Sequence, residues 1–186
     1  GLLVCDAKTG LLSVDIASGA IDVLVDEIDG HPLTFCNNAA VTLDGTIYFT
    51  SSSRRHGIET PDRDVIEYVP TGRLIERKPD GRVRVILDDL YFANGVALSV
   101  DETSVFVAET AQAKINRVNL TEAKFGERTD FVANLPGLPD NLSRGTDGLI
   151  WAGLVADNDA VVAVVRAVPY WLRWIVARLP EFLKPK

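Results

Sequence analysis

Residues 92–110 read Phe-Ala-Asn-Gly-Val-Ala-Leu-Ser-Val-Asp-Glu-Thr-Ser-Val-Phe-Val-Ala-Glu-Thr, and this stretch decides the fold of the chain. Val96, Leu98 and Val100 alternate with smaller or polar residues, which is the pattern of a β-strand. Residues 101–104 supply turn chemistry, and residues 105–108 form a β-branched and aromatic run. The stretch therefore predicts two short strands joined at a turn. Asn94 would place a side-chain carbonyl oxygen at the entrance of the first strand.

The same phrase occurs twice more, at residues 37–50 and 140–153. Each copy has Asn or Asp, a short strand, an acidic turn and then an apolar strand that carries an aromatic residue. The copies begin at positions 37, 94 and 140, so they start 57 and 46 residues apart. A repeated unit of this size with several short strands is typical of a β-propeller blade, which usually has about 40 to 50 residues.

The other segments supply the remaining strands of the blades. A first blade without its innermost strand is expected to have strands at 2–7, 10–15 and 21–26. A complete second blade has strands at 39–43, 46–51, 72–78 and 83–88, with a polar insertion at 52–64. The blade that Asn94 opens continues with strands at 114–120 and 128–133, and a strand at 149–155 follows Asp140. Two complete and two partial blades could form a four-bladed ring, but the partial blades lie at the two ends and could merge into one, and the resulting three blades are too few to close a ring. The sequence thus predicts a fragment of a larger ring, with open sheet edges through which it could self-associate.

Residues 159–186 differ from the blades of residues 1–158. They are strongly apolar, but Arg166, Arg173 and Arg178 interrupt the run, and Pro169 and Pro180 limit the length of any helix. We expect short helical segments that pack against the propeller. The alternative is an interfacial membrane contact through residues 160–183, since Trp and Arg suit a headgroup boundary. Three arginines in so short a run argue against a transmembrane span.

Composition restricts the partners. The 186 residues carry a net charge of −7, so no basic face is available for nucleic acid. Cys5 and Cys36 are too few for a disulfide framework. We expect two buried thiols, and a single bridge between them stays open.

Three segments resemble a known family: Phe92-Ala-Asn-Gly-Val-Ala-Leu-Ser, Val107-Ala-Glu-Thr and Leu135-Pro-Gly-Leu-Pro-Asp-Asn-Leu. They are similar to the conserved region of strictosidine synthase, in the variant found in adipocyte plasma-membrane-associated proteins. That family lies within the six-bladed propellers that include gluconolactonase, regucalcin and paraoxonase. The resemblance runs over essentially the whole chain. It implies an all-β fold, a partial six-bladed β-propeller of about three to four blades with a short helical C-terminal segment, and it favours a secretory or extracytoplasmic location.

The resemblance also implies a metal site. In the lactonase relatives the first residue of each phrase points into the central channel and binds a divalent ion, usually calcium. The matching positions here are Asn37, Asn94 and Asp140, with Asn141 as an addition. Calcium takes carboxylate and amide oxygens in a flexible set of six to eight. The alternative is that these residues only cap strands and turns.

The activity that the resemblance implies is calcium-dependent hydrolysis of a small-molecule ester or lactone, as in arylesterases and lactonases. Two alternatives stay open: a non-catalytic propeller that binds a partner, and condensation of an amine with an aldehyde. The glutamate base of the plant synthases has no counterpart here. Ser51 also stands where the family often has Asp, and a metal carboxylate from the first blade is missing. No catalytic residue can be assigned.

Two histidines offer further chemistry. His31 lies close to Asn37 in the sequence and is either near the channel mouth or in an exposed loop. Residues 51–53 are serines near His56, but no nucleophile elbow is present and no acid is evident to orient the imidazole. The sequence therefore predicts no serine triad.

Overall fold

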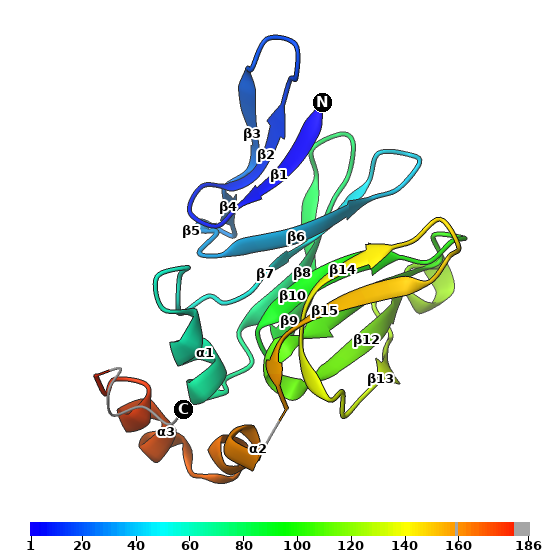
Figure 1. Cartoon of the computed structure of the whole chain (residues 1–186). Helices are drawn as coiled ribbons and strands as arrows, with labels where there is room; N and C mark the ends of the chain where they lie inside the picture. The colour runs from blue at the N-terminus through cyan, green and yellow to red at the C-terminus, as the bar shows by residue number, and fades with distance from the viewer. Residues whose placement is uncertain (159, 181–186) are drawn as a thin grey trace.

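The computed structural model describes residues 1–158 and 160–180, whose strands form consecutive antiparallel sheets lying side by side (Figure 1). The first sheet contains β1 (Leu2–Asp6), β2 (Gly10–Val14) and β3 (Ile21–Val25). The second contains β6 (Cys36–Val41), β7 (Ile47–Ser51), β8 (Gly72–Arg77) and β9 (Val83–Leu90). The third contains β10 (Ala93–Leu98), β11 (Ser104–Glu109), β12 (Lys114–Asn119) and β13 (Arg128–Val132), and the last contains β14 (Gly137–Arg144) and β15 (Ile150–Asp157). The prediction of an all-β partial propeller is confirmed, with two complete and two partial blades.

The hydrophobic core lies between successive blades. One cluster joins Tyr48 and Leu74 of the second blade to Val96 and Val107 of the third. Similar clusters join the first sheet to the second and the third sheet to the last. Every residue of β10 and β11 is buried, including the polar residues Asn94, Ser104 and Glu109. Each blade is thus held by apolar packing against its neighbours.

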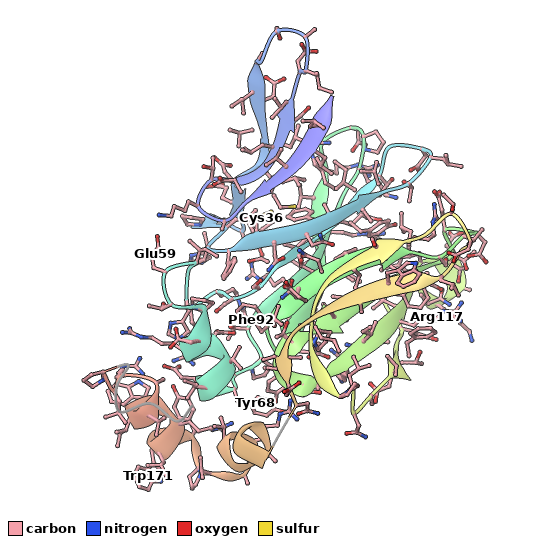
Figure 2. The ribbon with its side chains drawn as sticks, viewed as in Figure 1. Cys36, Glu59, Tyr68, Phe92, Arg117 and Trp171 are labelled. Atoms are coloured by element: carbon pink, nitrogen blue, oxygen red, sulfur yellow. The ribbon has the colours of Figure 1, made fainter. Side chains whose placement is uncertain are left out.

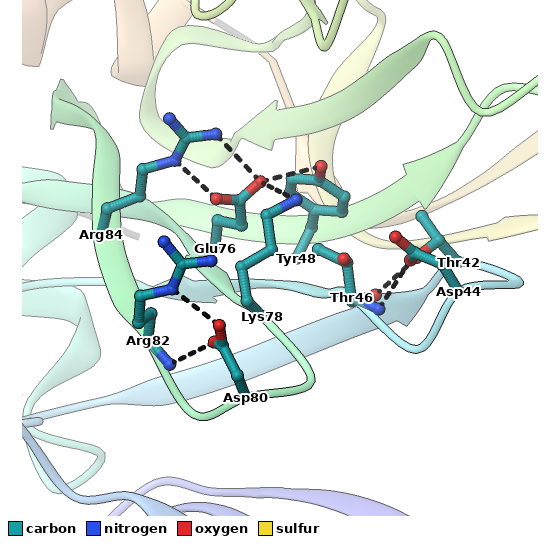
Figure 3. A network of polar contacts seen from close by, with 9 residues as sticks. All are labelled: Thr42, Asp44, Thr46, Tyr48, Glu76, Lys78, Asp80, Arg82 and Arg84. Carbon is teal, nitrogen blue, oxygen red and sulfur yellow. Dashed lines mark hydrogen bonds and ion pairs between the residues drawn. The ribbon is translucent and has the colours of Figure 1, made fainter.

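Glu76 on β8 is a buried carboxylate at the outer side of the second blade (Figure 3). It pairs with Arg84 and with Lys78, whose Nζ lies 3.2 Å from Oε1. The Tyr48 hydroxyl donates a hydrogen bond of 3.1 Å to the same oxygen. A buried charge needs such partners because its transfer from water is costly. The positive side chains here are therefore compensated within the blade.

Two small elements were missed in the sequence. The polar insertion contains α1 (Pro61–Glu67), which begins with a proline, the residue favoured in a first helical turn. Residues 27–32 form a hairpin of β4 (Glu27–Ile28) and β5 (His31–Pro32), whose turn residues Asp29 and Gly30 both have positive φ. The Asp-Gly pair is a standard signal for such a turn. Two 3₁₀ turns, η1 (Thr110–Gln112) and η2 (Glu122–Lys124), complete the elements before the C-terminal helices.

The C-terminal segment is helical, as predicted. Helices α2 (Ala160–Ala167) and α3 (Tyr170–Val176) gather with α1 on one side of the sheets (Figure 1). The Arg166 guanidinium donates a hydrogen bond of 2.9 Å to the Ala111 carbonyl, which ties α2 to the third blade. Positions 159 and 181–186 of the predicted segment lie outside the described residues. Among the described helices, none is long and apolar enough to cross a membrane.

Candidate functional site

A pocket of about 440 Å³ opens where the inner strands of successive blades begin. Three of the four predicted metal ligands, Asn37, Asn94 and Asp140, line it together. They come from β6, β10 and β14 in turn, at equivalent places in the repeat. The structure thus brings these three residues into one pocket, and their role as metal ligands stays a prediction.

The same β-bulge carries the three residues in each blade. Residues 37–38, 94–95 and 140–141 each form a pair that faces a single residue of the next strand, at Thr50, Ala108 and Gly153. A bulge bends the strand and re-aims its side chains, and bulges are frequent next to active sites. The expectation that Asn94 stands before its strand is therefore wrong: it lies within β10. The first residue of each bulge lines the pocket.

Asn141 does not line the pocket, because it is the second residue of its bulge, and its side chain is exposed. The equivalent residue of the second blade, Asn38, accepts a hydrogen bond of 2.7 Å from the backbone N–H of Val96 in the next blade. The second bulge position therefore serves contacts between blades. The structure thus places Asn141 apart from the other three candidate ligands, and its role as a ligand stays a prediction.

Asn94 is held with its amide oxygen unpaired. Its Nδ2 donates a hydrogen bond of 3.1 Å to Thr110 Oγ1, and Thr110 in turn donates one of 2.7 Å to the carbonyl of Pro139. Asn94 is 3% exposed, and its Oδ1 is buried without a hydrogen-bond partner. A buried polar atom with no partner is costly unless something binds it. This oxygen fits a cation at the pocket.

The second blade repeats this device. Asn37 Nδ2 donates a hydrogen bond of 2.9 Å to Ser52 Oγ, so the amide nitrogen is engaged here as well. Ser52 and Thr110 each follow the strand paired with the bulge, at matching places in the two blades. These two hydroxyls were not predicted from the sequence, although aligning the repeats places a hydroxyl residue directly after the second strand in both blades.

The rest of the pocket wall is mostly apolar. Phe35, Phe92 and Leu138 each lie two residues before a candidate ligand in the sequence and line the same pocket. Figure 2 shows Phe92 near the centre of the molecule. Its ring packs edge to face with that of Phe35 at a centroid distance of 5.6 Å. Phe92 has a φ of 57°, which is unusual for a bulky residue and is found mostly at functional sites.

Helix α1 covers one side of the pocket with Pro61, Asp62 and Val65. Asp62 therefore brings a second carboxylate to the pocket. Sequence analysis could not find this residue, because nothing in the insertion indicates which blade face it covers. Among the described residues no group of three or more His, Cys, Asp and Glu side chains could hold a metal ion. The candidate set relies instead on amide oxygens together with the Asp140 carboxylate, a mixture that suits calcium.

Cys5 and Cys36 line the same pocket and are both free thiols, with Cys36 buried and Cys5 half-buried. Cys36 lies on β6 in Figure 2, beside the first sheet. The hydrogen bond between the two thiols lowers the pKa of Cys5 below its ordinary value. The same hydrogen bond and then burial raise the pKa of Cys36. Of the two arrangements left open by the sequence, the structure has the thiols.

The remaining sequence candidates lie elsewhere. His31 is exposed on β5 and does not line this pocket. Ser53 donates a hydrogen bond of 2.6 Å to Asp64 Oδ1. An acid does lie beside the imidazole, contrary to the expectation from sequence, since His56 Nε2 is 3.4 Å from Glu67 Oε2. Ser53 and His56 therefore pair with different carboxylates, and the conclusion that they form no serine triad stands.

Asp64 should make the stability of the protein depend on pH. Burial raises its pKa to about 6, against the hydrogen bond from Ser53 and the charges of His56 and Arg55. The folded protein then binds the proton more tightly than the unfolded chain, so stability is lost as the pH rises from about 4 to 6. The two pKa values differ by about 2 units, which corresponds to about 3 kcal/mol.

We expect Asp64→Asn to remove this dependence. The free energy of unfolding of the variant, relative to the original protein, should rise by about 3 kcal/mol between pH 4 and pH 7 in urea titrations. Asp15→Asn is the control, because hydrogen bonds from Ser18 lower the pKa of that exposed carboxyl. If the difference in unfolding free energy between Asp64→Asn and the original protein stays constant from pH 4 to pH 7, the expectation is contradicted.

Comparison with known proteins supports this description of the fold. The strictosidine synthase family model matches residues 37–123, which include two of the three bulges. Adipocyte plasma membrane-associated protein of Salmo salar is 39% identical over 160 residues, covering 83% of this chain and 38% of the relative. Strictosidine synthase-like 10 of Arabidopsis thaliana is 37% identical over 181 residues, covering 96% of this chain and 48% of the relative. The chain spans less than half the length of these relatives.

Solved structures show the same fold. A gluconolactonase of Xanthomonas campestris superposes with a TM-score of 0.66 and 23% identity, covering 82% of this chain and 52% of that one. The calcium-binding protein regucalcin of Agrobacterium tumefaciens gives a TM-score of 0.61 and 19% identity, with 82% and 49% covered. The chain therefore belongs to the family of the strictosidine synthase-like and adipocyte plasma membrane-associated proteins, and it carries part of a propeller of the gluconolactonase and regucalcin kind.

Proposed function

We propose that this chain carries part of the active site of a calcium-dependent hydrolase that acts on small esters or lactones. The observation that carries the proposal is the buried, unpaired Oδ1 of Asn94 in a pocket that Asn37 and Asp140 also line. Similarity to a calcium-binding regucalcin and to a gluconolactonase supports it. A secretory or extracytoplasmic location is part of the same proposal.

The candidate ligands are held in place before any ion binds. Thr110 fixes the amide of Asn94 and also bonds the carbonyl of Pro139, the residue before Asp140. Thr50 Oγ1 donates a hydrogen bond of 2.6 Å to the backbone carbonyl of Asn94. Ligands fixed by neighbouring hydrogen bonds need little reorganisation when a cation binds. Bound calcium would supply Lewis-acid polarisation of an ester or lactone carbonyl.

The chain's own residues favour an uncharged, partly apolar substrate. Phe35, Phe92 and Leu138 present apolar surface beside the three oxygen ligands, and Ile58 and Val65 extend it from the insertion. A volume of about 440 Å³ is within the range of small-molecule sites. Apolar walls also exclude water, which strengthens electrostatic interactions in the pocket. An acyl or lactone ring could therefore pack there with its carbonyl directed at the ligands.

The test measures metal binding and activity separately. Calorimetric titration with calcium should show one site, and hydrolysis of an aryl ester or a simple lactone should be lost with chelator. Asp140→Ala removes the one carboxylate of the set, so calcium affinity should fall about a hundredfold and activity should fall with it. Asp147→Ala is the matched control, since it removes a carboxylate from the β14–β15 hairpin that does not line the pocket.

Two results would decide against the proposal. Hydrolysis that survives both the chelator and Asp140→Ala would exclude the metal mechanism. Calcium binding without hydrolysis of either substrate would instead favour a propeller that binds a partner and performs no chemistry.

A further inference from the structure

A second pocket, of about 770 Å³, lies beside the insertion and is rich in arginine. Three arginines line it, Arg54 and Arg55 from the loop after β7 and Arg73 from β8. Asp29 and His31 also line it, from the β4–β5 hairpin. With neutral histidine these side chains sum to a charge of +2 in a chain whose net charge is −7. The pocket is therefore a local exception to the acidity of the protein.

Among the described residues, two of these arginines form no salt bridge within 4 Å. Arg54 donates from Nε to the Thr71 carbonyl and from Nη2 to the Asp88 carbonyl, both at 3.3 Å, so it binds only neutral backbone groups. Arg73 Nε is buried without a hydrogen-bond partner. Across residues 1–158 and 160–180, no carboxylate lies within 4 Å of either guanidinium. Burial and then the neighbouring charge of Arg54 lower the pKa of Arg73, against the more weakly acting charges of Asp29 and Asp88.

Some basic side chains elsewhere in the described structure are compensated by a carboxylate. Arg84 and Lys78 pair with Glu76, and Arg82 pairs with Asp80 at 2.7 Å (Figure 3). Arg55, the third arginine of the second pocket, is engaged with Glu67 at 2.7 Å. Holding two like charges close together without an anion between them is unfavourable, and a bound anion would relieve it. Arg54 and Arg73 are thus the two arginines of this pocket that form no salt bridge, and Asp29 and Asp88 offset the charge of Arg73 only from a greater distance.

From this arrangement we propose that the second pocket binds the phosphate group of a small molecule. A phosphate group has enough oxygens to contact both guanidiniums at once, whereas a monocarboxylate offers one charge and two oxygens. The planar guanidinium fork forms paired hydrogen bonds with phosphate oxygens. The volume leaves room for more than the phosphate itself, so the ligand is a phosphorylated metabolite or a lipid headgroup.

The location gives the bound phosphate a structural consequence. The insertion that supplies Arg54 and Arg55 continues into Ile58 and Pro61, which line the candidate hydrolase pocket. A phosphate held by Arg54 and Arg73 would cross-link this insertion to β8. It would therefore fix the segment that covers the first pocket, although the two pockets do not share any lining residue.

The experiment titrates the full chain with pyrophosphate and with inorganic phosphate at constant ionic strength, using sodium chloride and acetate as controls. We expect saturable binding of the phosphates in calorimetry and a rise in thermal midpoint that chloride and acetate do not give. Arg73→Gln and Arg54→Gln should each weaken phosphate binding about tenfold or more, because each removes a charge-assisted contact. Arg82→Gln, at the exposed arginine paired with Asp80, should leave it unchanged.

Arg54 is exposed, so its variant keeps the test valid if the half-buried Arg73 proves necessary for folding. Vesicles that contain phosphatidic acid distinguish the two sources. If the original protein sediments with the vesicles and the Arg54→Gln variant does not, the ligand is a lipid headgroup. If the protein binds phosphate but does not sediment with the vesicles, the ligand is a soluble molecule. Absence of saturable phosphate binding, or equal affinity in the original protein and both pocket variants, would overturn the proposal.

Discussion

Replacing Gly95 by alanine is expected to destabilise the protein by more than about 4 kcal/mol, the range that marks severe overpacking. A Cβ at position 95 would lie 2.1 Å from the backbone nitrogen of Leu142 and 2.5 Å from the carbonyl oxygen of Asp140. Both atoms belong to the backbone of β14, which cannot turn aside as a flexible side chain can. The variant should therefore separate the third blade from the last one.

The matched control is Gly153→Ala. Gly153 lies on β15 opposite the bulge of β14, and a Cβ there would meet only the carbonyl oxygen of Asn141 at 3.9 Å, an ordinary contact. We expect the control to unfold within about 1 kcal/mol of the original protein. Thermal and urea unfolding followed by circular dichroism would measure both variants. A Gly95→Ala variant as stable as the control would show that the third and last blades are not packed as closely as the structure has them.

The repeat made the fold predictable from sequence. Three in-phase copies of one sequence phrase indicate the strand order. They also place Asn37, Asn94 and Asp140 at equivalent positions of their blades, which predicts that the three side chains lie in one pocket. The strands near the insertion were predictable only in part, because α1 has seven residues and too little periodicity to separate it from a loop. The Asp-Gly signal at residues 29–30 was present but lay between strands already assigned.

The geometry of the site depends on contacts that sequence does not contain. A β-bulge is defined by two strands together, so the pair at 94–95 facing Ala108 cannot be derived from either strand alone. The two residues of each bulge have different surroundings: the first faces the pocket, and the second faces the next blade. This is why Asn141 was grouped with Asp140 in the sequence and separates from it in the structure.

The prediction of self-association through open sheet edges stays a prediction. Gly95 nevertheless indicates how closely neighbouring blades must fit, because its backbone touches that of β14 without a side chain between them. Any further blade beside β14 would meet the exposed residue Asn141 at the equivalent position. Asn38 shows that this position can bond a neighbouring strand when one is present.

The buried carboxylate of Glu67 joins the C-terminal segment to the insertion. Its side chain is 1% exposed, and its oxygens lie 2.7 Å from Arg55 and 2.6 Å from Arg178. Burial disfavours its charged form, but the hydrogen bonds of Arg178 and His56 and the charge of Arg55 outweigh burial, so its pKa is lowered. Arg178 follows α3, and Glu67 is the last residue of α1. The two helices are therefore joined by a charge network inside the protein.

Glu67→Ala should destabilise this junction by about 3 kcal/mol or more, since removing one member of a buried ion pair leaves its partners uncompensated. Arg55 and Arg178 would then face each other across a cavity, and α3 should separate from α1. Trp174, which stacks on Arg178 at 3.9 Å, provides the local signal, so its fluorescence should change at lower urea than the circular dichroism of the sheets. Glu59→Ala is the control, because Glu59 pairs with Lys8 at the surface of the same insertion (Figure 2). A surface pair contributes about 0 to 1 kcal/mol, so that variant should unfold as the original protein does. Equal stability of the Glu67 and Glu59 variants would mean that apolar packing, and not the carboxylate, holds the helices in place.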